Sequence, residues 1–542
     1  MRRLFLGGVL MVVVLNGLAV VFYPPLLWSM VVFAPLILLG FYDFFQTRHT
    51  VLRNFPLLGH FRYLFESIRP EIYQYFIESD TSGVPFSREQ RTVVYQRAKK
   101  VRDTVPFGTL RDMYAVGHEW VTHSLRPRHV DSSDMRLTVG GPHCTQPYSS
   151  SILNISAMSF GSLSKNAILA LNQGAKMGNF AHNTGEGGIS PYHLRGGGDL
   201  IWQIGTGYFG CRTHEGQFCQ DTFTKCATLP NVKMIEIKLS QGAKPAHGGI
   251  LPAAKLTKEI AEIRDVPMGQ DVLSPPAHSA FSTPIGLLEF VAKLRELSGG
   301  KPVGFKLCLG RRREFIAICK AMVKTGITPD FITVDGAEGG TGAAPLEFTN
   351  RVGAPLIESL IVVHNALVGF AVRDQILLIA GGKITSGFGI IKRLALGADM
   401  CNSARAMMMA LGCIQALKCN SNHCPTGVTT QDPQLMAGLV VSDKNRRVAN
   451  FHEETLKSVA EIIGAMGLEG TADLRPWHVL RRTGPNEIKN YSEIFDFLGV
   501  GDLVGENVPA AWERACAMAS AESFEHIKAI RDAGQSIEAG IV

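Results

Sequence analysis

The residues that most directly indicate chemistry are three cysteines in the run GCIQALKCNSNHCPTG, namely Cys413, Cys419 and Cys424. Their spacing is C-x5-C-x4-C, and Pro425 follows at once. Thiolates this close in sequence can converge on one iron–sulfur cluster, and three ligands suit a cluster that lacks one iron. Structural zinc sites favour C-x2-4-C spacing and a fourth ligand, for which His423 is available. The run therefore predicts an iron–sulfur cluster, with a zinc site or simply buried cysteines as the alternatives.

A glycine-rich stretch, ILLIAGGKITSGFGIIKRLALGADMCNSARAMM, leads directly into the cysteine run. One expected strand ends at Gly381 and Gly382, a turn at 385–387 opens a helix, and the next strand ends at Ser403, shortly before Arg405. In barrels the loops after the seventh and eighth strands form a phosphate cradle from backbone N–H groups and a helix N-terminus. Two ordinary glycine turns are the alternative. A phosphate site beside a redox cluster suggests a flavoenzyme that is fed by single electrons.

Polar residues also follow several other expected strands. MSFGS is expected to close a strand at Met158–Ser159, and the loop NTGEGG carries one carboxylate, Glu186. The strand in IEIKLSQGAKP ends at Lys238, with Gln241 and Lys244 on the loop beyond it. Two cations and an amide at the strand ends of a barrel could hold a dicarboxylate. The alternatives are a plain connecting loop and solvated lysines.

Two further strand ends complete the set. Lys306 interrupts the apolar run VGFKLC, and a buried lysine needs a partner to offset the cost of burial. In a flavin barrel that partner would be the N1/C2 carbonyl region of the ring. Asp335 ends a strand in FITVDGAEGGTGAAP, but the glycine loop after it lacks G-x-G-x-x-G spacing, and no such fingerprint appears elsewhere in a strand–helix–strand setting. We therefore expect no nicotinamide domain of that type, and electrons from a protein partner.

The elements that position these residues fit an α/β barrel. Between residues 145 and 445, apolar β-branched runs alternate with helical segments, as parallel strands buried on both faces do. The expected strands are ILNISAMS, VKMIEIKL, PVGFKLC, DFITVDG, ILLIAGG and ADMCNS. We predict a (β/α)8 TIM barrel, with a doubly wound open sheet as the alternative. Residues 43–144 read as a juxtamembrane helical region, with a helical patch in REQRTVVYQRAKKVRD, and residues 446–542 as a C-terminal helical tail.

The composition of the 542-residue chain excludes some classes of function. The net charge of +7 is modest and no Lys/Arg run is long, so no nucleic-acid partner is expected. Eleven cysteines scattered over a long chain favour a reducing compartment over a secreted disulfide framework.

The N-terminus reads as a transmembrane hairpin. Residues 4–22 and 26–42 carry no charge, and Tyr23-Pro24-Pro25 separates them. Arginines flank both outer ends, whereas the connecting turn has no Lys or Arg. The positive-inside rule then places the catalytic part on the cytoplasmic side of the inner membrane. Arg2-Arg3 also resembles a twin-arginine export signal, but no small-residue cleavage site follows the first apolar stretch.

Taken together and in this order, the motifs resemble the FMN-binding barrel of the glutamate synthase family. The resemblance covers about 145–445 and rests on MSFGS, NTGEGG, EIKLSQGAKP, DGAEGGTGAAP, GGKITSG and the cysteines before CPTGVTTQDP. The layout, with an N-terminal hairpin, resembles short membrane-anchored members of the family in bacteria.

This resemblance implies a reaction in which 2-oxoglutarate and ammonia condense to 2-iminoglutarate and reduced FMN delivers a hydride to the imine carbon. A ferredoxin or a reductase subunit would return electrons through a [3Fe-4S] cluster on Cys413, Cys419 and Cys424. The resemblance further implies that Glu186, Lys238, Gln241 and Lys244 line the oxo-acid side. It implies FMN contacts for Met158, Ser159, Gln203, Lys306, Asp335, Gly381, Gly382, Ser403 and Arg405.

Departures from the family pattern leave other readings open. The chain begins Met1-Arg2-Arg3, where the full enzyme has a glutaminase domain with an N-terminal cysteine, so we expect it to need free ammonia or an amidotransferase subunit. Ala337-Glu338 stand where His-Asp is typical, and His247 replaces an acidic residue. One alternative is a subunit that resembles methylamine–glutamate N-methyltransferase. Another is a membrane-bound flavin and iron–sulfur electron carrier, or an assembly partner for a quinone-linked complex.

Overall fold

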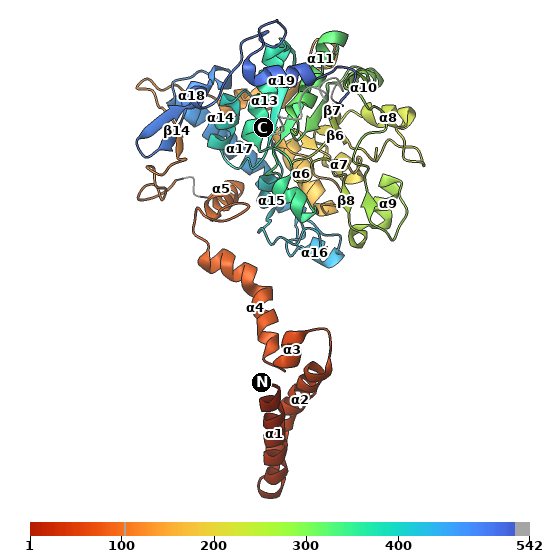
Figure 1. Ribbon diagram of the computed structural model, residues 1–542, viewed down its shortest axis with the longest axis vertical. Coiled ribbons are helices and arrows are strands. Elements are labelled where there is room, and N and C mark those ends of the chain that lie inside the picture. Colours follow the sequence, from red (N-terminus) through yellow and green to blue (C-terminus); the bar gives the residue numbers. More distant parts are fainter. Residues whose placement is uncertain (102–103, 526–542) are drawn as a thin grey trace, which may run out of the picture. The chain divides into compact units, whose positions relative to one another are not determined.

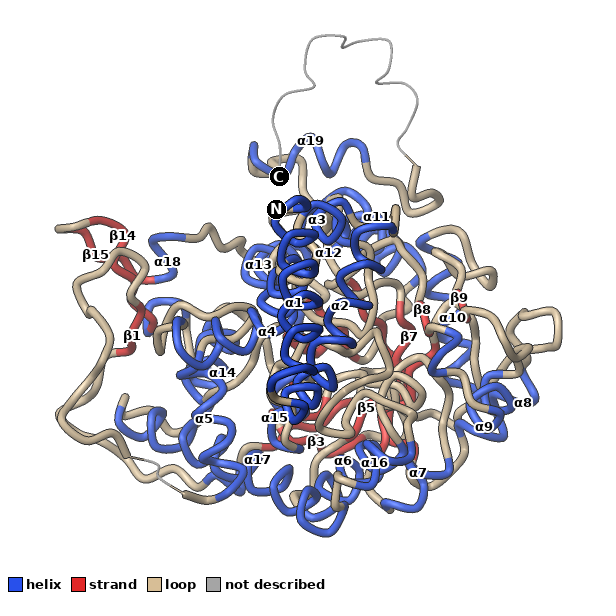
Figure 2. Tube along the Cα trace, turned by 90° about the horizontal axis from the view of Figure 1, so that it is seen from below, coloured by secondary structure: helices blue, strands red, loops and turns tan. Residues whose placement is uncertain are grey.

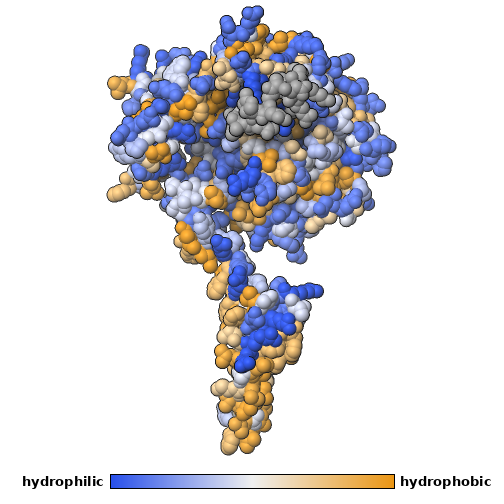
Figure 3. All heavy atoms as spheres, viewed as in Figure 1, coloured by the Kyte–Doolittle hydropathy of each residue, from blue (hydrophilic) through white to orange (hydrophobic). Residues whose placement is uncertain are grey.

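The computed structural model describes residues 1–101 and 104–525, and the chain divides into two compact units, residues 1–88 and the part from Glu89 onward. The first unit opens with α1 (Arg2–Phe22) and α2 (Met30–Phe45), joined by the 3-10 helix η1 (Pro24–Ser29). Two segments, Arg2–Phe22 and Leu27–Phe45, are long and apolar enough to cross a membrane. Their surface is mostly orange in Figure 3. The predicted break at the two prolines is thus confirmed.

Polar side chains connect the pieces of this unit. The Asn16 amide oxygen accepts from Ser29 Oγ at 2.8 Å, which joins α1 to η1. Asp43, near the end of α2, is buried and accepts from the Leu57 backbone N–H at 3.0 Å. It also bonds His60 Nε2 at 2.9 Å. These contacts fix the segment after α2, which contains α3 (Thr50–Asn54), α4 (Gly59–Ile72) and the π-helix η2 (Tyr73–Ile77).

In the second unit, eight parallel strands of the described chain close into a barrel, as predicted. In ring order they are β4 (Leu153–Ile155), β5 (His182–Asn183), β6 (Leu200–Ile204), β7 (Val232–Lys238), β10 (Val303–Leu307), β11 (Phe331–Asp335), β12 (Leu377–Gly381) and β13 (Met400–Ser403). Most of these strands are buried throughout because helices cover the outside of the barrel, as Figures 1 and 2 show. Side chains from the strand ends therefore meet at one rim.

Helices follow the strands in the alternation that a barrel requires. They are α6 (Lys165–Met177), α7 (Pro191–Gly196), α8 (Gln220–Ala227), α9 (Lys258–Arg264), α10 (Pro284–Leu297), α11 (Arg312–Thr325), α12 (Leu346–Arg351), α13 (Leu356–Gly369), α14 (Gly387–Ala395) and α15 (Arg405–Leu411). Ser164 caps α6 by accepting from the Ala167 N–H, and Ser386 caps α14 in the same way from Gly389. The predicted helix after residues 385–387 is thus confirmed.

A hairpin that precedes the barrel fills its N-terminal mouth. The strands β2 (Arg136–Val139) and β3 (Tyr148–Ser151) pair with each other. Val139 and Tyr148 from this hairpin pack in one buried cluster with residues near the strand starts, among them Phe331, Ile379 and Met400. The Tyr148 hydroxyl donates to Asp199, just before β6, at 2.9 Å. The candidate site residues Lys238, Lys306 and Gly381 lie at the opposite end of their strands.

The remaining elements surround the barrel. α17 (Val441–Ala465) packs on α6, α14 and α15, and α5 (Arg88–Lys99) confirms the predicted helical patch. β1 (Glu119–Val121), β14 (Val479–Gly484) and β15 (Glu487–Asn490) form a separate antiparallel sheet. The other elements are β8 (Ile250–Leu251), β9 (Val272–Leu273), α16 (Pro433–Ala437), α18 (Tyr491–Ile494) and α19 (Ala510–Met518).

The structure corrects the sequence predictions in three places. The strand in ILNISAMS ends at Ile155, so Met158 and Ser159 lie in the loop beyond it and do not close the strand. The barrel strands β5 and β6 were not expected, because β5 has two residues and β6 reads LIWQI within a glycine-rich, polar stretch. The tail from 446 contains helices and also the β14–β15 pair, and residues 526–542 lie outside the described part of the chain.

Candidate active site

A cluster of charged side chains occupies the carboxyl end of the barrel. Glu186, in the loop after β5, pairs with Lys238, the last residue of β7, at 2.7 Å. Burial alone would raise the pKa of Glu186, but Lys238, together with Arg264 and Lys244, holds it below its ordinary value. Burial lowers the pKa of Lys238, and neighbouring Lys306 adds to that effect. Cations therefore outnumber carboxylates around this pair, which favours an anionic ligand.

Lys306 is the least satisfied member of the cluster. It lies opposite Lys238 in the pairing of β10 with β7 and is 5% exposed. Within residues 1–101 and 104–525, its Nζ makes no hydrogen bond or ion pair. A buried ammonium without a partner costs free energy, so this position favours an electron-rich group supplied by a ligand.

Lys244 and Gln241 approach the same cluster from the loop after β7. Lys244 is 2% exposed and donates to the Ala343 carbonyl at 2.9 Å. Burial lowers its pKa to about 8, and Glu186 opposes that shift. Gln241 is half-buried and lines a recess of about 10 Å³ together with Lys238 and His247. The sequence-predicted residues Glu186, Lys238 and Lys244 are thus brought together, with Gln241 beside them.

A close backbone contact brings the NTGEGG loop onto the loop after β4. A Cβ at Gly185 would lie 2.6 Å from the Ser159 backbone nitrogen, and Gly185 has φ +65°, so only glycine fits here. Ser159 Oγ donates to Ser162 Oγ at 3.1 Å, and Met158 is buried. The residues predicted for the flavin ring therefore lie next to those predicted for the oxo acid.

A buried carboxylate below this layer was missed by sequence reasoning. Glu236 in β7 is fully buried and accepts from Asn183 at 2.9 Å, Gln203 at 2.5 Å and Thr333 at 2.7 Å. These donors come from β5, β6 and β11, so the carboxylate joins separate strands across the barrel interior. The predicted ring contact Gln203 is held in this network. The available signal was an acidic residue two positions before Lys238, on the same face of an apolar strand.

The predicted phosphate cradle lies at the ends of β12 and β13. A Cβ at Gly381 would lie 3.1 Å from Asp335 Oδ1, and one at Gly382 would lie 3.2 Å from Leu356. Asp335 also accepts from the Gly242 N–H at 2.9 Å. The two glycines thus allow a close backbone approach that side chains would obstruct.

Ser403 and Arg405 are held by backbone carbonyls beside these glycines. Ser403 Oγ donates to Ile384 at 2.7 Å, and Arg405 donates to Glu338 at 2.6 Å. The Glu338 carboxylate lies near Gly382 and accepts from the Leu356 N–H. It therefore places a negative charge beside the cradle, which Arg405 offsets.

The three motif cysteines share one loop. Burial raises the pKa of Cys413 to about 11, and the charges of Cys419 and Cys424 add to the shift, so the thiols lie near one another. Burial alone would raise the pKa of Cys424, but hydrogen bonds from Thr426 and Thr429 hold it below its ordinary value. Tyr95 of α5 donates to the Cys413 carbonyl at 2.8 Å.

The backbone of this loop is strained. Gln415, Leu417 and Asn422 all have φ between +56° and +64°, a conformation that costs free energy and clusters at functional sites. In the described part of the chain, no three His, Cys, Asp or Glu side chains stand ready to hold a metal ion, and His423 is exposed.

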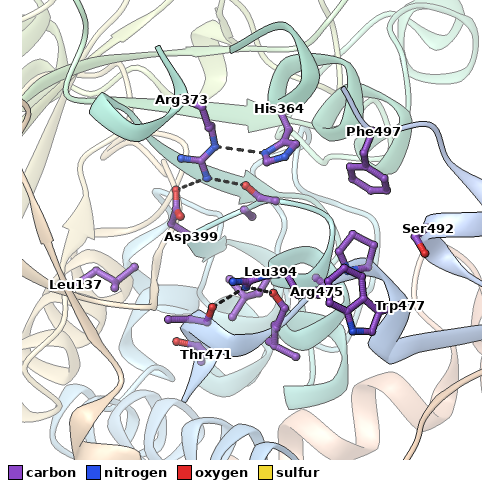
Figure 4. Close-up of a pocket in the computed structure, with 16 residues that line it drawn as sticks. Leu137, His364, Arg373, Leu394, Asp399, Thr471, Arg475, Trp477, Ser492 and Phe497 are labelled. Carbon is purple, nitrogen blue, oxygen red and sulfur yellow. Dashed lines mark hydrogen bonds and ion pairs between the residues drawn. The ribbon is translucent and has the colours of Figure 1, made fainter. Parts of the chain in front are cut away.

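A separate cavity lies at the other end of the barrel. It measures about 490 Å³ and is lined by Arg373 and Asp399, which precede β12 and β13, and by Arg475 and Trp477 (Figure 4). Arg373 pairs with Asp399 at 2.8 Å and also donates to the Gly397 carbonyl. The charged groups of this cavity already have partners within the protein. The cavity lies at the starts of the strands, and none of the predicted site residues lines it.

A family model described as a conserved region in glutamate synthase matches residues 138–469. The glutamate synthase large subunit-like protein YerD of Bacillus subtilis (strain 168) is 36% identical over 490 residues, which are 83% of this chain and 93% of YerD. The archaeal-type glutamate synthase (NADPH) of Thermotoga neapolitana is 36% identical over 59% of this chain and 60% of its own length.

The chain thus spans about 60% of that archaeal-type relative. Among solved structures, the flavin-binding domain of baker's yeast flavocytochrome b2 is 12% identical and covers 83% of this chain and 94% of that one, with a TM-score of 0.43. This similarity is too low to support an inference about the chain.

Proposed function

The chain belongs to the glutamate synthase family, and from this premise we propose that it reduces 2-iminoglutarate, formed from 2-oxoglutarate and ammonia, to L-glutamate. It is an oxidoreductase of the glutamate synthase type. The observation that carries the proposal is the excess of buried cations over carboxylates at the carboxyl end of the barrel, where Glu186 pairs with Lys238 and Lys306 has no partner in the described chain. A substrate with two carboxylates matches that excess.

The residues present fit FMN. Gly381, Gly382, Ser403 and Arg405 would hold its phosphate, and Met158, Ser159, Gln203 and Asp335 would contribute further contacts to the flavin. The unpartnered Lys306 supports this assignment, since positive charge near N1 stabilises a reduced, anionic flavin. When bound, FMN supplies the hydride for the imine carbon.

The chain's own residues bind and orient the acid. Lys238 and Lys244 would attract its carboxylates, and Gln241 offers an amide donor from the same loop. Lys244, whose pKa lies at about 8, holds its proton at neutral pH. Glu186 fixes Lys238 by an ion pair and keeps its ammonium directed into the site. The buried Glu236 network holds the strands that carry these groups in register.

We further propose that Cys413, Cys419 and Cys424 hold a [3Fe-4S] cluster that passes single electrons to the flavin. The donor set of three thiols and the strained loop support this assignment. The external donor would be a ferredoxin or a reductase subunit. The ammonia would be free or come from an amidotransferase subunit.

The helices α1 and α2 are proposed to anchor the enzyme in the cytoplasmic membrane, with the barrel on the cytoplasmic side. Their length, apolar surface and flanking arginines support this arrangement. Protease treatment of inverted and right-side-out vesicles tests it, because the barrel should be digested only in inverted vesicles. Digestion in right-side-out vesicles alone would assign the opposite orientation.

The activity itself is tested with detergent-purified protein, reduced ferredoxin, 2-oxoglutarate and ammonia. We expect glutamate to form and 2-oxoglutarate to be consumed in equal amounts. Alkylamine-dependent turnover without consumption of 2-oxoglutarate would replace the proposal with an N-methyltransferase-like role. Reduction of the cofactors by quinol without turnover of any amino acid would replace it with electron transfer alone.

The cluster is tested with Cys419→Ser. We expect iron and acid-labile sulfide to fall to background while FMN stays bound, because other residues form the phosphate cradle. Cys226→Ser is the matched control, since Cys226 is also half-buried but lies outside the motif, at the end of α8. Full iron content in the Cys419 variant would show that the ligand assignment is wrong.

A further inference from the structure

A buried lysine joins the cysteine loop to the loop after β4. Lys255 is 2% exposed and lies just after β8, in the long connection between β7 and β10. Its Nζ donates to the Ser162 carbonyl at 2.8 Å and to the Cys419 carbonyl at 3.0 Å. A second bond, from Asn422 Nδ2 to the Ala254 carbonyl at 3.0 Å, ties the same two segments. One side chain thus contacts both the proposed cluster loop and the loop that carries Ser159.

The loop after β4 is held along its whole length. Arg264 donates to the Phe160 carbonyl at 3.0 Å, and Gln431 donates to Gly161 at 3.0 Å and Leu163 at 2.9 Å. With Lys255 on Ser162, four successive carbonyls accept a hydrogen bond from a side chain. Because side chains from separate segments hold these carbonyls, a displacement at Lys255 would affect the loop after β4 as well as the cysteine loop.

The charge of Lys255 also lacks an acidic partner. Across residues 1–101 and 104–525 it forms no ion pair with a carboxylate, and its two contacts are backbone carbonyls. The titratable groups that face it are the thiols of Cys419 and Cys424. A buried ammonium is costly unless opposite charge compensates it, and a thiolate-ligated cluster would supply that charge.

We propose that Lys255 is a positioning residue for the cluster: it fastens the cysteine loop to the flavin-side loop, and its charge favours the reduced cluster. The inference rests on the proposed function. The cluster would take one electron from the external donor and pass it to the flavin, and two such transfers would supply each imine reduction. Every electron taken up adds one negative charge next to the Lys255 ammonium, which stabilises that state.

The test is a redox titration of purified full-length protein, followed by electron paramagnetic resonance for the cluster and by absorbance for the flavin. Lys255→Met removes the charge and both hydrogen bonds but keeps an apolar stem of similar length. We expect it to have a more negative cluster midpoint potential than the wild type, or to lose iron, while the flavin potential is unchanged. Lys255→Arg keeps the charge and should restore iron content and a potential close to that of the wild type.

Lys301→Met is the matched control. Lys301 is 8% exposed, and its Nζ also donates to two carbonyls, Ala227 at 2.6 Å and Leu229 at 3.0 Å. It precedes β10 at the opposite end of the barrel, so its loss should leave the cluster potential unchanged. Lys255→Gln keeps a donor without the charge, and it replaces the methionine variant if that protein does not accumulate.

The outcomes separate this inference from the proposed function. Full iron and a wild-type cluster potential in the neutral Lys255 variants would overturn the role of Lys255 while leaving the cluster in place. An equal potential shift in the Lys301 variant would also overturn it, because the effect would then be a general one of losing a buried lysine. Wild-type protein that contains flavin but no iron would remove the cluster itself, and Lys255 with it.

Discussion

The two ends of the barrel handle buried charge differently. At the strand starts, Arg295 pairs with Asp330 at 2.9 Å, and the same carboxylate accepts from the Val303 and Gly141 backbone N–H groups at 2.7 Å. At the strand ends, Lys306 has no partner within the described residues, and one carboxylate, Glu186, faces several cations. Charges that the chain satisfies itself stabilise the fold, whereas under-satisfied ones are available to a ligand.

Cavity size does not indicate which end of the barrel holds the charged groups that are available to a ligand. The cavity of about 490 Å³ lies at the strand starts, and the recess beside Lys238 measures about 10 Å³. At the strand starts the arginine Arg373 already has a carboxylate and carbonyls as partners. The candidate site thus differs from the large cavity in having buried charged groups without partners in the described chain, although its recess is far smaller.

The largest effect on stability is expected at the strand starts. Arg295→Met would leave Asp330 as a buried, unpaired carboxylate and should lower the free energy of unfolding by about 3–5 kcal/mol. Chemical denaturation followed by circular dichroism measures the change. Turnover per folded molecule should stay within about twofold of the wild type, since neither residue contacts the candidate site. A loss of turnover without a loss of stability would contradict the division between the two ends.

For Lys306→Met we expect a large loss of turnover with little change in stability, the reverse of Arg295→Met. Removing a buried ammonium without a partner should change the free energy of unfolding by no more than about 1 kcal/mol. Turnover should fall by about 100-fold, because a charge that stabilises the reduced flavin is lost, and the flavin potential should shift downward. An unchanged potential would refute the role assigned to Lys306, whereas a large loss of stability would show that it acts like Arg295.

Glu186 should show a smaller, pH-dependent effect. Its folded-state pKa lies below the ordinary value of 4.5, so its contribution to stability is complete above that value and is lost as the pH falls through the folded-state pKa. The difference in melting temperature between the wild type and Glu186→Gln should therefore be constant from about pH 7 to about pH 5.5 and shrink below about pH 4.5. A difference that grows with acidification would mean that the folded state raises the pKa.

The smallest effect is expected in the large cavity. Trp477 is 55% exposed and lies at its rim, so Trp477→Ala should change turnover by less than about twofold and leave cofactor content unchanged. Steady-state kinetics with 2-oxoglutarate and ammonia measures this. A strong loss of activity would show that the strand-start end takes part in the reaction.

Local patterns were sufficient for much of the fold. Apolar runs such as VKMIEIKL and DFITVDG predicted β7 and β11, and the glycine turn predicted the start of α14. The same reasoning extended the first barrel strand to Ser159, because β-branched and apolar residues continue after pairing stops at Ile155. It missed β14 and β15, whose sequence VLRRTGPNEIKN is mostly polar or charged and lies on a small peripheral sheet.

The site was predictable to the extent that its residues end strands. Lys238 and Lys306 could be placed on one rim because parallel strands end together. The pairing of Glu186 with Lys238 depends on how the loop after β5 folds, which no local pattern encodes. Lys255 gave no signal, since a single lysine in PAAK is typical of the surface. Glu236 was overlooked because its partners come from three other strands.

The β2–β3 hairpin determines the end of the barrel at which reactants can enter and leave. Val139 and Tyr148 block one mouth of the barrel. Small reactants must therefore enter and leave at the opposite rim, next to the loop that carries the cysteines. An electron-delivering protein seated over those cysteines would therefore share its approach with the organic acid. Reduction and substrate capture would then compete for access or proceed in a fixed order.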